Sequence, residues 1–283
     1  MIIESFLQVK KYLPAITIKH DITSLDDMFN VVENELTENI LSEELHNRLD
    51  EKREEDKSLF IQCERIISLT GFIRAIPDLD LVLTQSGFAV HNSEAMAPAS
   101  TARVKALTNS LQERVDNAID TLIRYLLSSE KYEDIWRVTP QFEKITSGLI
   151  STYSDFKEYA QYSPSVASQY PKSYSDFQKL YPNFNLALMG EISSYLSADY
   201  CSEIIEKIRD RENISTHEKY VINLIKYAIC AMSMNDLPSG RVHVIKACSY
   251  MMKYPNTFQT FISSPEGQAL DNTDNDRPIF SML

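Results

Sequence analysis

Apolar residues recur every three or four positions along almost the whole chain, a spacing that places them on one face of an α-helix. The longest run predicts a helix over residues 101–127, about 40 Å long. Other runs predict helices over 58–76, about 217–234 and about 241–253. The periodicity therefore predicts a mainly α-helical, multi-helix bundle.

Residues that favour helix ends lie beside these runs. Ser100 is the predicted N-cap of the longest helix, because a serine hydroxyl can accept a free backbone N–H there. Pro77 is expected to end the helix that starts at residue 58. Ser215 and Glu218 have the spacing of a capping box, in which the two side chains bond each other's backbone N–H groups. They predict a helix start at Ser215.

One segment alternates instead, and it predicts a β-hairpin over about residues 79–91. Leu79, Leu81 and Leu83 share one face of the first strand. Gly87 suits the turn because it tolerates a left-handed backbone. A lone hairpin is only marginally stable in water, so we expect it to pack on the helices or to pair with a partner chain.

The pattern divides the chain into four regions. They are a helical half with the hairpin (1–138), a connection rich in Tyr, Ser and Pro (139–185), a second helical half (186–270) and a flexible polar tail (271–283).

The two halves resemble each other, which suggests two duplicated helical halves. In each half a Leu-Ser pair, Leu41-Ser42 or Leu196-Ser197, precedes a new helix. In each, a long apolar helix, a proline-marked turn and a further helix follow. The alternative is that amphipathic helices simply resemble one another.

The chain is acidic, with 40 Asp and Glu against 28 Lys and Arg and a net charge of −12. That balance argues against a nucleic-acid partner, which needs a basic face. Residues 21–60 alone contain thirteen acidic and four basic residues. This region is either a solvated surface or a charged surface that meets a basic partner or a cation.

The setting expected from the sequence is cytoplasmic. The first residues lack the basic-then-apolar order of a secretory signal, and no run approaches the length of about 20 apolar residues needed to span a membrane. The four cysteines, Cys63, Cys201, Cys230 and Cys248, are far apart in sequence. They are expected to be buried free thiols.

No pattern of catalytic, cofactor-binding or metal-binding residues stands out. No two of the six glycines lie within fifteen residues of each other, which excludes glycine-rich phosphate loops. One Glu-x-x-His, from Glu43 to His46, is present, but a di-iron bundle needs two. We therefore expect no catalytic residues, no cofactor and no metal, although an active site assembled from distant residues stays open.

Tyrosine is concentrated in residues 151–200, which contain eight of the fifteen. Tyrosine suits wet protein interfaces, because it offers area and a hydroxyl at low entropic cost. The segment is either a connection packed over the bundle or a docking segment. Together with the hairpin it gives a candidate protein-interaction surface: Tyr159, Tyr162, Tyr170, Tyr174, Val82 and Phe88.

Several stretches, taken together, resemble a known group of proteins. They are residues 79–90 (LDLVLTQSGFAV), 97–100 (APAS) leading to Arg103-Val104, the repeated YSDF at 153–156 and 174–177, Leu180-Tyr181-Pro182, and Ile279-Phe280 after an Asp-rich segment. The chain resembles an uncharacterised family encoded in phages and integrated elements of Bacteroidetes. It departs from that family at residues 280–283, which lack a glycine-ending tail, and its second half lacks a copy of the hairpin.

The resemblance implies a non-enzymatic virion assembly or head–tail connector protein. Its partners would be other virion proteins or further copies of itself, and it would be cytoplasmic or incorporated in the virion. No catalytic residues carry over from the family. Two alternatives remain: a soluble cytoplasmic helical adaptor, and an enzyme with a dispersed active site. A deep pocket with perturbed ionisable groups would favour the enzyme.

Overall fold

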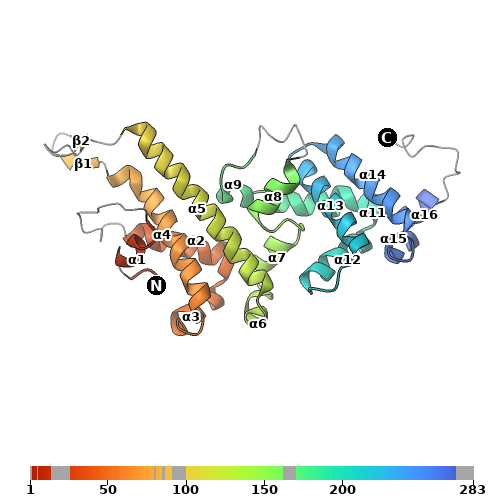
Figure 1. The fold of residues 1–283 in the computed structure, drawn as a ribbon, viewed down its shortest axis with the longest axis horizontal. Coiled ribbons are helices and arrows are strands. Elements are labelled where there is room, and N and C mark those ends of the chain that lie inside the picture. Colours follow the sequence, from red (N-terminus) through yellow and green to blue (C-terminus); the bar gives the residue numbers. More distant parts are fainter. Residues whose placement is uncertain are drawn as a thin grey trace. The chain divides into compact units, whose positions relative to one another are not determined.

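A computed structural model of the chain describes residues 2–4, 6–13, 26–79, 81–84, 87–90, 100–161 and 170–271. These residues are mainly helical (Figure 1), which confirms the predicted all-α character. The chain divides into two compact units, unit 1 over Met1–Phe142 and unit 2 over Glu143–Leu283.

Unit 1 is built around three long helices and several short elements. In chain order its elements are α1 (Phe6–Lys10), α2 (Asp26–Leu36), the π-helix η2 (Thr37–Leu41), α3 (Glu43–Glu51), α4 (Lys57–Leu79), β1 (Leu81–Thr84), β2 (Gly87–Val90), α5 (Thr101–Ser128) and α6 (Glu133–Trp136), followed by α7 (Pro140–Thr146), which crosses the boundary between the units.

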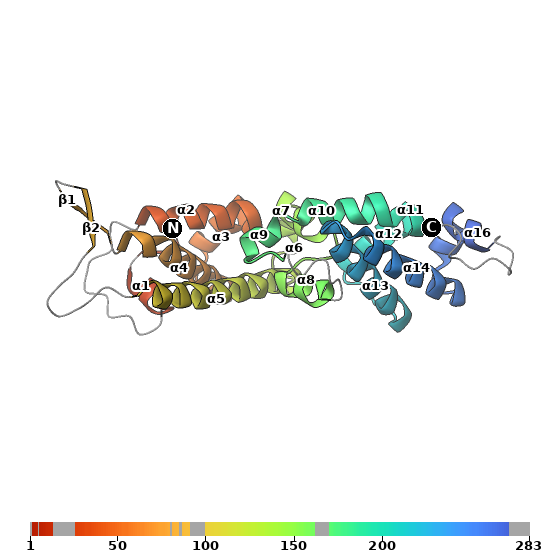
Figure 2. The same ribbon diagram turned by 90° about the horizontal axis from the view of Figure 1, so that it is seen from above.

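The core of unit 1 lies where α4 packs against both α5 and α2 (Figure 2). The predicted helix over 101–127 is confirmed as Thr101–Ser128, and its apolar stripe is buried from Leu111 to Leu126. Ser100 precedes the helix as expected, but its side chain makes no capping hydrogen bond, so that part of the prediction is wrong.

The prediction that Pro77 ends its helix is also wrong, because α4 runs two residues further to Leu79. Pro77 removes one helix hydrogen bond and its ring crowds the preceding turn, and the helix continues for only two residues beyond it. β1 and β2 then pair antiparallel, with Leu81 opposite Val90 and Thr84 opposite Gly87. β1 begins at Leu81 and not at Leu79. Whether the hairpin packs on the helices or pairs with a partner chain remains a prediction.

Unit 2 contains α8 (Tyr153–Ala160), α9 (Tyr174–Gln178), α10 (Tyr181–Leu186), the π-helix η3 (Ala187–Ile192), α11 (Ser193–Leu196), α12 (Ala198–Arg209), α13 (Thr216–Ser233), α14 (Leu237–Lys253), α15 (Gln259–Ser263) and α16 (Pro265–Asp271). The capping box at Ser215 and Glu218 is confirmed. Residues 272–283, most of the predicted tail, lie outside the described residues.

Aromatic side chains fill part of the core of unit 2, and they come from the region predicted as a connection. Phe177 is fully buried, and the centroid of its ring lies 5.2 Å from that of Tyr181 and 5.7 Å from that of Phe184. Residues 139–161 and 170–185 therefore form short helices and turns with buried aromatic rings, rather than a bare connection. The two YSDF sequences begin α8 and α9, where Thr152 and Ser173 cap the helix starts.

The two Leu-Ser pairs share an unusual backbone. Ser42 has φ 83° and ψ 156°, and Ser197 has φ 69° and ψ 149°. Each serine caps the helix that follows, because Ser42 Oγ accepts from Leu45 N and Ser197 Oγ accepts from Tyr200 N. A π-helix lies shortly before each serine. This region of backbone space is almost restricted to glycine, so both serines are strained.

The similarity between the two Leu-Ser segments extends to the buried residues on either side of the serines. Pairs of residues with the same sequence separation as Ser42 and Ser197 are buried in both units: Phe29 and Phe184, Leu41 and Leu196, Leu45 and Tyr200, Leu49 and Ile204. The match agrees with the duplication hypothesis. Superposition of residues 1–127 on residues 170–253 is its direct test.

Replacement of Ser42 by glycine is expected to stabilise unit 1 by about 1 kcal/mol. Relief of about 1–3 kcal/mol of strain outweighs the few tenths lost at the cap and about 0.5–1 kcal/mol of added backbone entropy in the unfolded chain. Ser42→Ala keeps the strain and loses the cap, so it should destabilise by about 1 kcal/mol. Chemical denaturation measures both.

Ser215 provides the matched control, because it caps α13 with an ordinary φ of −64°. Ser215→Gly has no strain to relieve and should lower stability. Equal effects of glycine at Ser42 and Ser215 would contradict the assignment of strain to Ser42.

Candidate protein-interaction surfaces

The structure places the predicted surface residues in different settings. Tyr159 is half-buried, and its hydroxyl donates to Asn223 Oδ1 at 3.0 Å. Tyr170 is half-buried against Phe156. Tyr174 is buried among the aromatic rings, so its place on a surface is corrected: the helix it begins turns its ring inward.

The other predicted surface residues are only partly described. Tyr162 lies outside the described residues. Val82 and Phe88 lie in β1 and β2, opposite Ala89 and Leu83 respectively, and only their backbones are described.

A surface that the sequence analysis missed lies along α13 and α14. These helices form an antiparallel hairpin in which Asp236 caps α14 by accepting from Ser239 N at 3.2 Å. Gly240 allows close packing at the turn, because a Cβ there would come within 2.4 Å of Met232 Cγ. This close packing holds the side chains along the seam of the hairpin next to one another.

Tyrosine and histidine side chains follow this seam, and we call them the aromatic ridge. The ridge consists of Tyr159 from α8, His217, Tyr220 and Tyr227 from α13, and His243 and Tyr250 from α14, with Tyr254 directly after α14.

The rings of the ridge contact one another in two groups. Near the end of α14, the centroid of the Tyr250 ring lies 4.4 Å from that of Tyr220 and 4.8 Å from that of Tyr254. His217 Nδ1 and the Tyr250 hydroxyl lie 2.8 Å apart, at hydrogen-bonding distance. Near the start of α14, Tyr227 lies between Tyr159 and His243, with centroids at 5.0 and 5.2 Å. Tyr220 is 47% exposed and Tyr254 39% exposed, so part of this aromatic surface faces solvent.

Lysines flank the ridge. Lys246 and Lys253 are exposed and lie four residues before and three residues after Tyr250, so all three share one face of α14. Lys226 lies over the ring of Tyr159 with its Nζ 5.2 Å from the centroid. α14 contains no acidic residue. The α14 part of the ridge is therefore aromatic and basic on a chain of net charge −12, whereas Glu158 and Asp155 act on Tyr159.

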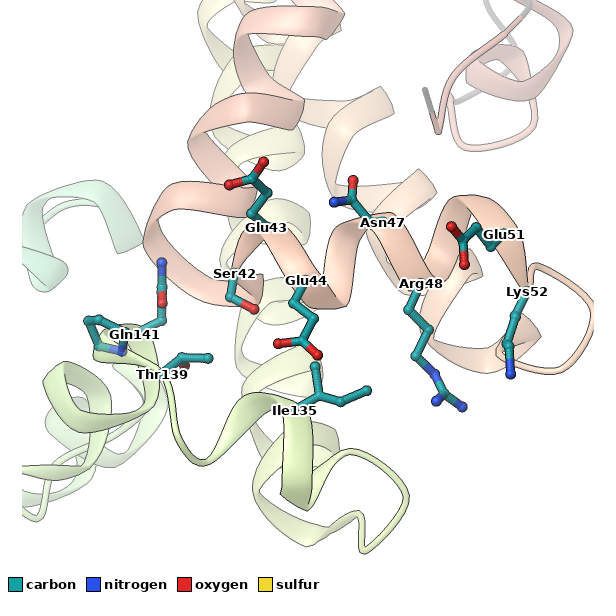
Figure 3. A pocket seen from close by; sticks show the side chains of 11 residues that line it. Ser42, Glu43, Glu44, Asn47, Arg48, Glu51, Lys52, Ile135, Thr139 and Gln141 are labelled. Carbon is teal, nitrogen blue, oxygen red and sulfur yellow. The ribbon is translucent and has the colours of Figure 1, made fainter.

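Unit 1 carries a surface of opposite character, which we call the acidic hollow. Its volume is about 760 Å³, and Figure 3 shows its walls. The residues that line it are Ser42, Glu43, Glu44, Asn47, Arg48, Glu51 and Lys52 on one side, and Ile135, Thr139, Pro140 and Gln141 on the other.

Two hydrogen bonds hold the walls of the acidic hollow together. Trp136 Nε1 donates to the carbonyl of Ile40 at 2.6 Å, and Gln141 Nε2 donates to the carbonyl of Glu38 at 3.1 Å. Ile135 and Pro140 add apolar surface on the side opposite α3. The hollow thus combines carboxylates with an apolar rim.

Buried carboxylates fix the segments around α3 and α4. Glu33 accepts the backbone N–H of Ile2 at 3.0 Å and pairs with His46 Nε2 at 2.7 Å. Glu64 accepts from Gln8 and Lys11, both at 3.1 Å, and from the Tyr12 hydroxyl. His46 therefore pairs with Glu33 and not with Glu43, the partner in the Glu-x-x-His pattern.

Unit 1 is expected to lose stability as pH rises through neutrality, because of His46. The hydrogen bond to Glu33 raises the pKa of His46. A raised pKa stabilises the fold below the unfolded value of about 6.5, and this contribution is lost as pH rises through the folded value. His46→Gln can still donate to Glu33 but does not titrate in this range.

The measurement is denaturation of wild type and His46→Gln between about pH 5.5 and about pH 8.5, on either side of the ordinary histidine value. Wild type should lose stability relative to the variant across this range. A constant difference would exclude titration of His46 as the cause.

The thiols match the sequence prediction, since all four cysteines are free and buried. Burial raises the pKa of Cys201 and of Cys248 to about 12, and that of Cys63 and Cys230 further still. A protonated buried thiol is a poor nucleophile.

The described residues contain neither a cluster of metal ligands nor a membrane-spanning helix. No group of three or more His, Cys, Asp or Glu side chains there is arranged to hold a metal ion. No helix in the same residues is long and apolar enough to cross a membrane.

Comparison with known protein families gives a match over much of unit 1. Residues 25–145 match a family of unknown function, DUF6712. The matched segment covers most of unit 1, including α3 and the acidic hollow. No curated protein and no solved structure is significantly similar to the chain.

Proposed function

We propose that the protein is a non-enzymatic structural protein of a phage or an integrated element, and that it joins other virion proteins during assembly at or near the head–tail connection. The aromatic ridge carries this proposal. Tyrosines with exposed ring area are typical of surfaces that bind proteins. The resemblance in sequence to phage-encoded proteins supplies the setting.

The proposed partners are proteins, either other virion components or further copies of this chain. The acidic balance of the chain opposes contact with DNA, which favours a position away from the packaged genome. A cytoplasmic helical adaptor would use the same ridge, so the particle itself must distinguish the two functions.

The test is mass spectrometry of purified particles from a host that expresses either the wild-type chain or Tyr220→Ser/Tyr254→Ser. These tyrosines are exposed, so the variant should fold. Leu186→Ser is the matched control, because Leu186 is an exposed apolar residue of unit 2 outside the ridge.

We expect wild type and the control in particles at a fixed copy number, and the ridge variant at a reduced one. Wild type that stays in the lysate, while capsid proteins are found in the particles, would overturn the virion role and favour the adaptor. Equal incorporation of all three chains would exclude the ridge as the docking surface.

A further inference from the structure

The ridge and the hollow are complementary in charge and in chemistry. The ridge presents Lys246 and Lys253 beside partly exposed tyrosines. The hollow presents Glu44 on α3 next to Ile135 of the opposite segment (Figure 3), and Glu51 further along α3. Carboxylates can pair with the lysines and accept from tyrosine hydroxyls, while aromatic rings can cover an apolar rim.

The carboxylates of the hollow are available for a partner. Glu43, Glu44 and Glu51 are exposed, and none forms an ion pair with another described residue. The two cations of the lining are paired with carboxylates outside it, Arg48 with Asp56 and Lys52 with Glu55. The acidic side chains that line the hollow therefore keep their charge directed to the surface.

We infer that the aromatic ridge of one copy docks into the acidic hollow of a second copy. This inference rests on the proposed function and names the partner of the ridge. A chain of net charge −12 repels its own copies at long range, so self-association needs a local contact of opposite charge. The ridge and the hollow are such a pair, and every copy carries both.

The contact is heterologous, because two different surfaces meet. One docking event leaves a free ridge on one copy and a free hollow on the other, so further copies can add in the same way. The attraction is electrostatic at its rim and should weaken at about 1 M salt, where the Debye length is about 3 Å.

The test is a charge swap in the full chain, followed by sedimentation velocity over a range of protein concentrations. Lys246→Glu/Lys253→Glu reverses the ridge, and Glu44→Lys/Glu51→Lys reverses the hollow. Each variant alone should weaken self-association by about tenfold or more, because like charges then face each other. The chain that carries all four substitutions should regain it.

Lys172→Glu/Lys179→Glu is the matched control, since it makes the same change in net charge at exposed lysines of unit 2 outside the ridge. It should associate like wild type. Circular dichroism checks that every variant is folded, and an equimolar mixture of the two reversed variants should associate even if the fourfold variant fails to fold.

A wild-type chain that stays monomeric at every concentration would overturn the inference, as would a swapped pair that fails to restore association. Failure of the proposed function is recognised separately. A monomeric chain that still enters particles through its ridge keeps the virion role and loses the second copy as partner. A chain that self-associates but is absent from particles keeps the second copy as partner and loses the virion role.

Discussion

Replacement of Phe177 by alanine is expected to destabilise unit 2 by about 3–5 kcal/mol, the usual cost of truncating a buried phenylalanine. Phe177 is fully buried, and five aromatic rings surround it. These five rings belong to α8, α9 and α10. The cavity left by the alanine therefore cannot collapse unless several helices move. An effect of this size is a large fraction of the stability of a domain.

The single tryptophan allows the unfolding of unit 1 to be followed separately from that of unit 2. Trp136 is buried in unit 1, so its fluorescence follows that unit, whereas circular dichroism follows both. Phe177→Ala should lower the denaturation midpoint of part of the dichroism signal and leave the fluorescence midpoint in place. The exposed Leu186→Ala is the control and should change neither. Parallel shifts of both signals would mean that the units unfold together.

Replacement of Asp56 by asparagine is expected to destabilise unit 1 by about 2–3 kcal/mol at neutral pH. The Asp56 side chain is fully buried, and it accepts from Arg48 Nε at 2.8 Å, Lys131 Nζ at 2.5 Å and the Tyr132 hydroxyl at 3.0 Å. Removal of one partner of a buried pair usually costs about 3–5 kcal/mol. Arg48 and Lys131 reach water, which lowers the expected cost.

The effect of Asp56→Asn should depend on pH. Burial alone would raise the pKa of Asp56, but the hydrogen bonds from Arg48, Lys131 and Tyr132 together hold it below its ordinary value. A lowered pKa stabilises the fold above the unfolded value of about 4, and this contribution is lost as pH falls through the folded value. Denaturation of both chains across this range should show their stabilities converge in acid. A gap that persists at the lowest pH would point to packing instead of charge.

The long helices could be predicted because their signals are local. The helix over 101–127 and the capping box at Ser215 follow from residues three or four positions apart, and both match the structure closely. The region 139–185 was harder to predict, because its described helices are only five to eight residues long and their aromatic rings are buried by contacts between distant segments. Short helices depend on tertiary packing more than on their own sequence.

The strained serines and the ridge show what sequence alone leaves open. Serine is a common N-cap, so the sequence at Ser42 and Ser197 gives no indication of a backbone conformation that glycine would normally adopt. The ridge did have a signal, since His217, Tyr220 and Tyr227 recur at helical spacing. That spacing predicts a shared face but cannot tell whether the face is covered. The acidic hollow brings α3 next to residues almost a hundred positions later, a contact that periodicity does not encode.

Because the four thiols are buried, folded molecules are protected from disulfide cross-linking. A sulfur that neither reaches the surface nor ionises cannot exchange with a disulfide on a neighbouring molecule. Intact copies can therefore associate and separate under oxidising conditions without becoming cross-linked. A disulfide-linked band on a non-reducing gel then indicates molecules that have opened, and mapping the bond to Cys63 or to one of the other three cysteines identifies the unit that opened.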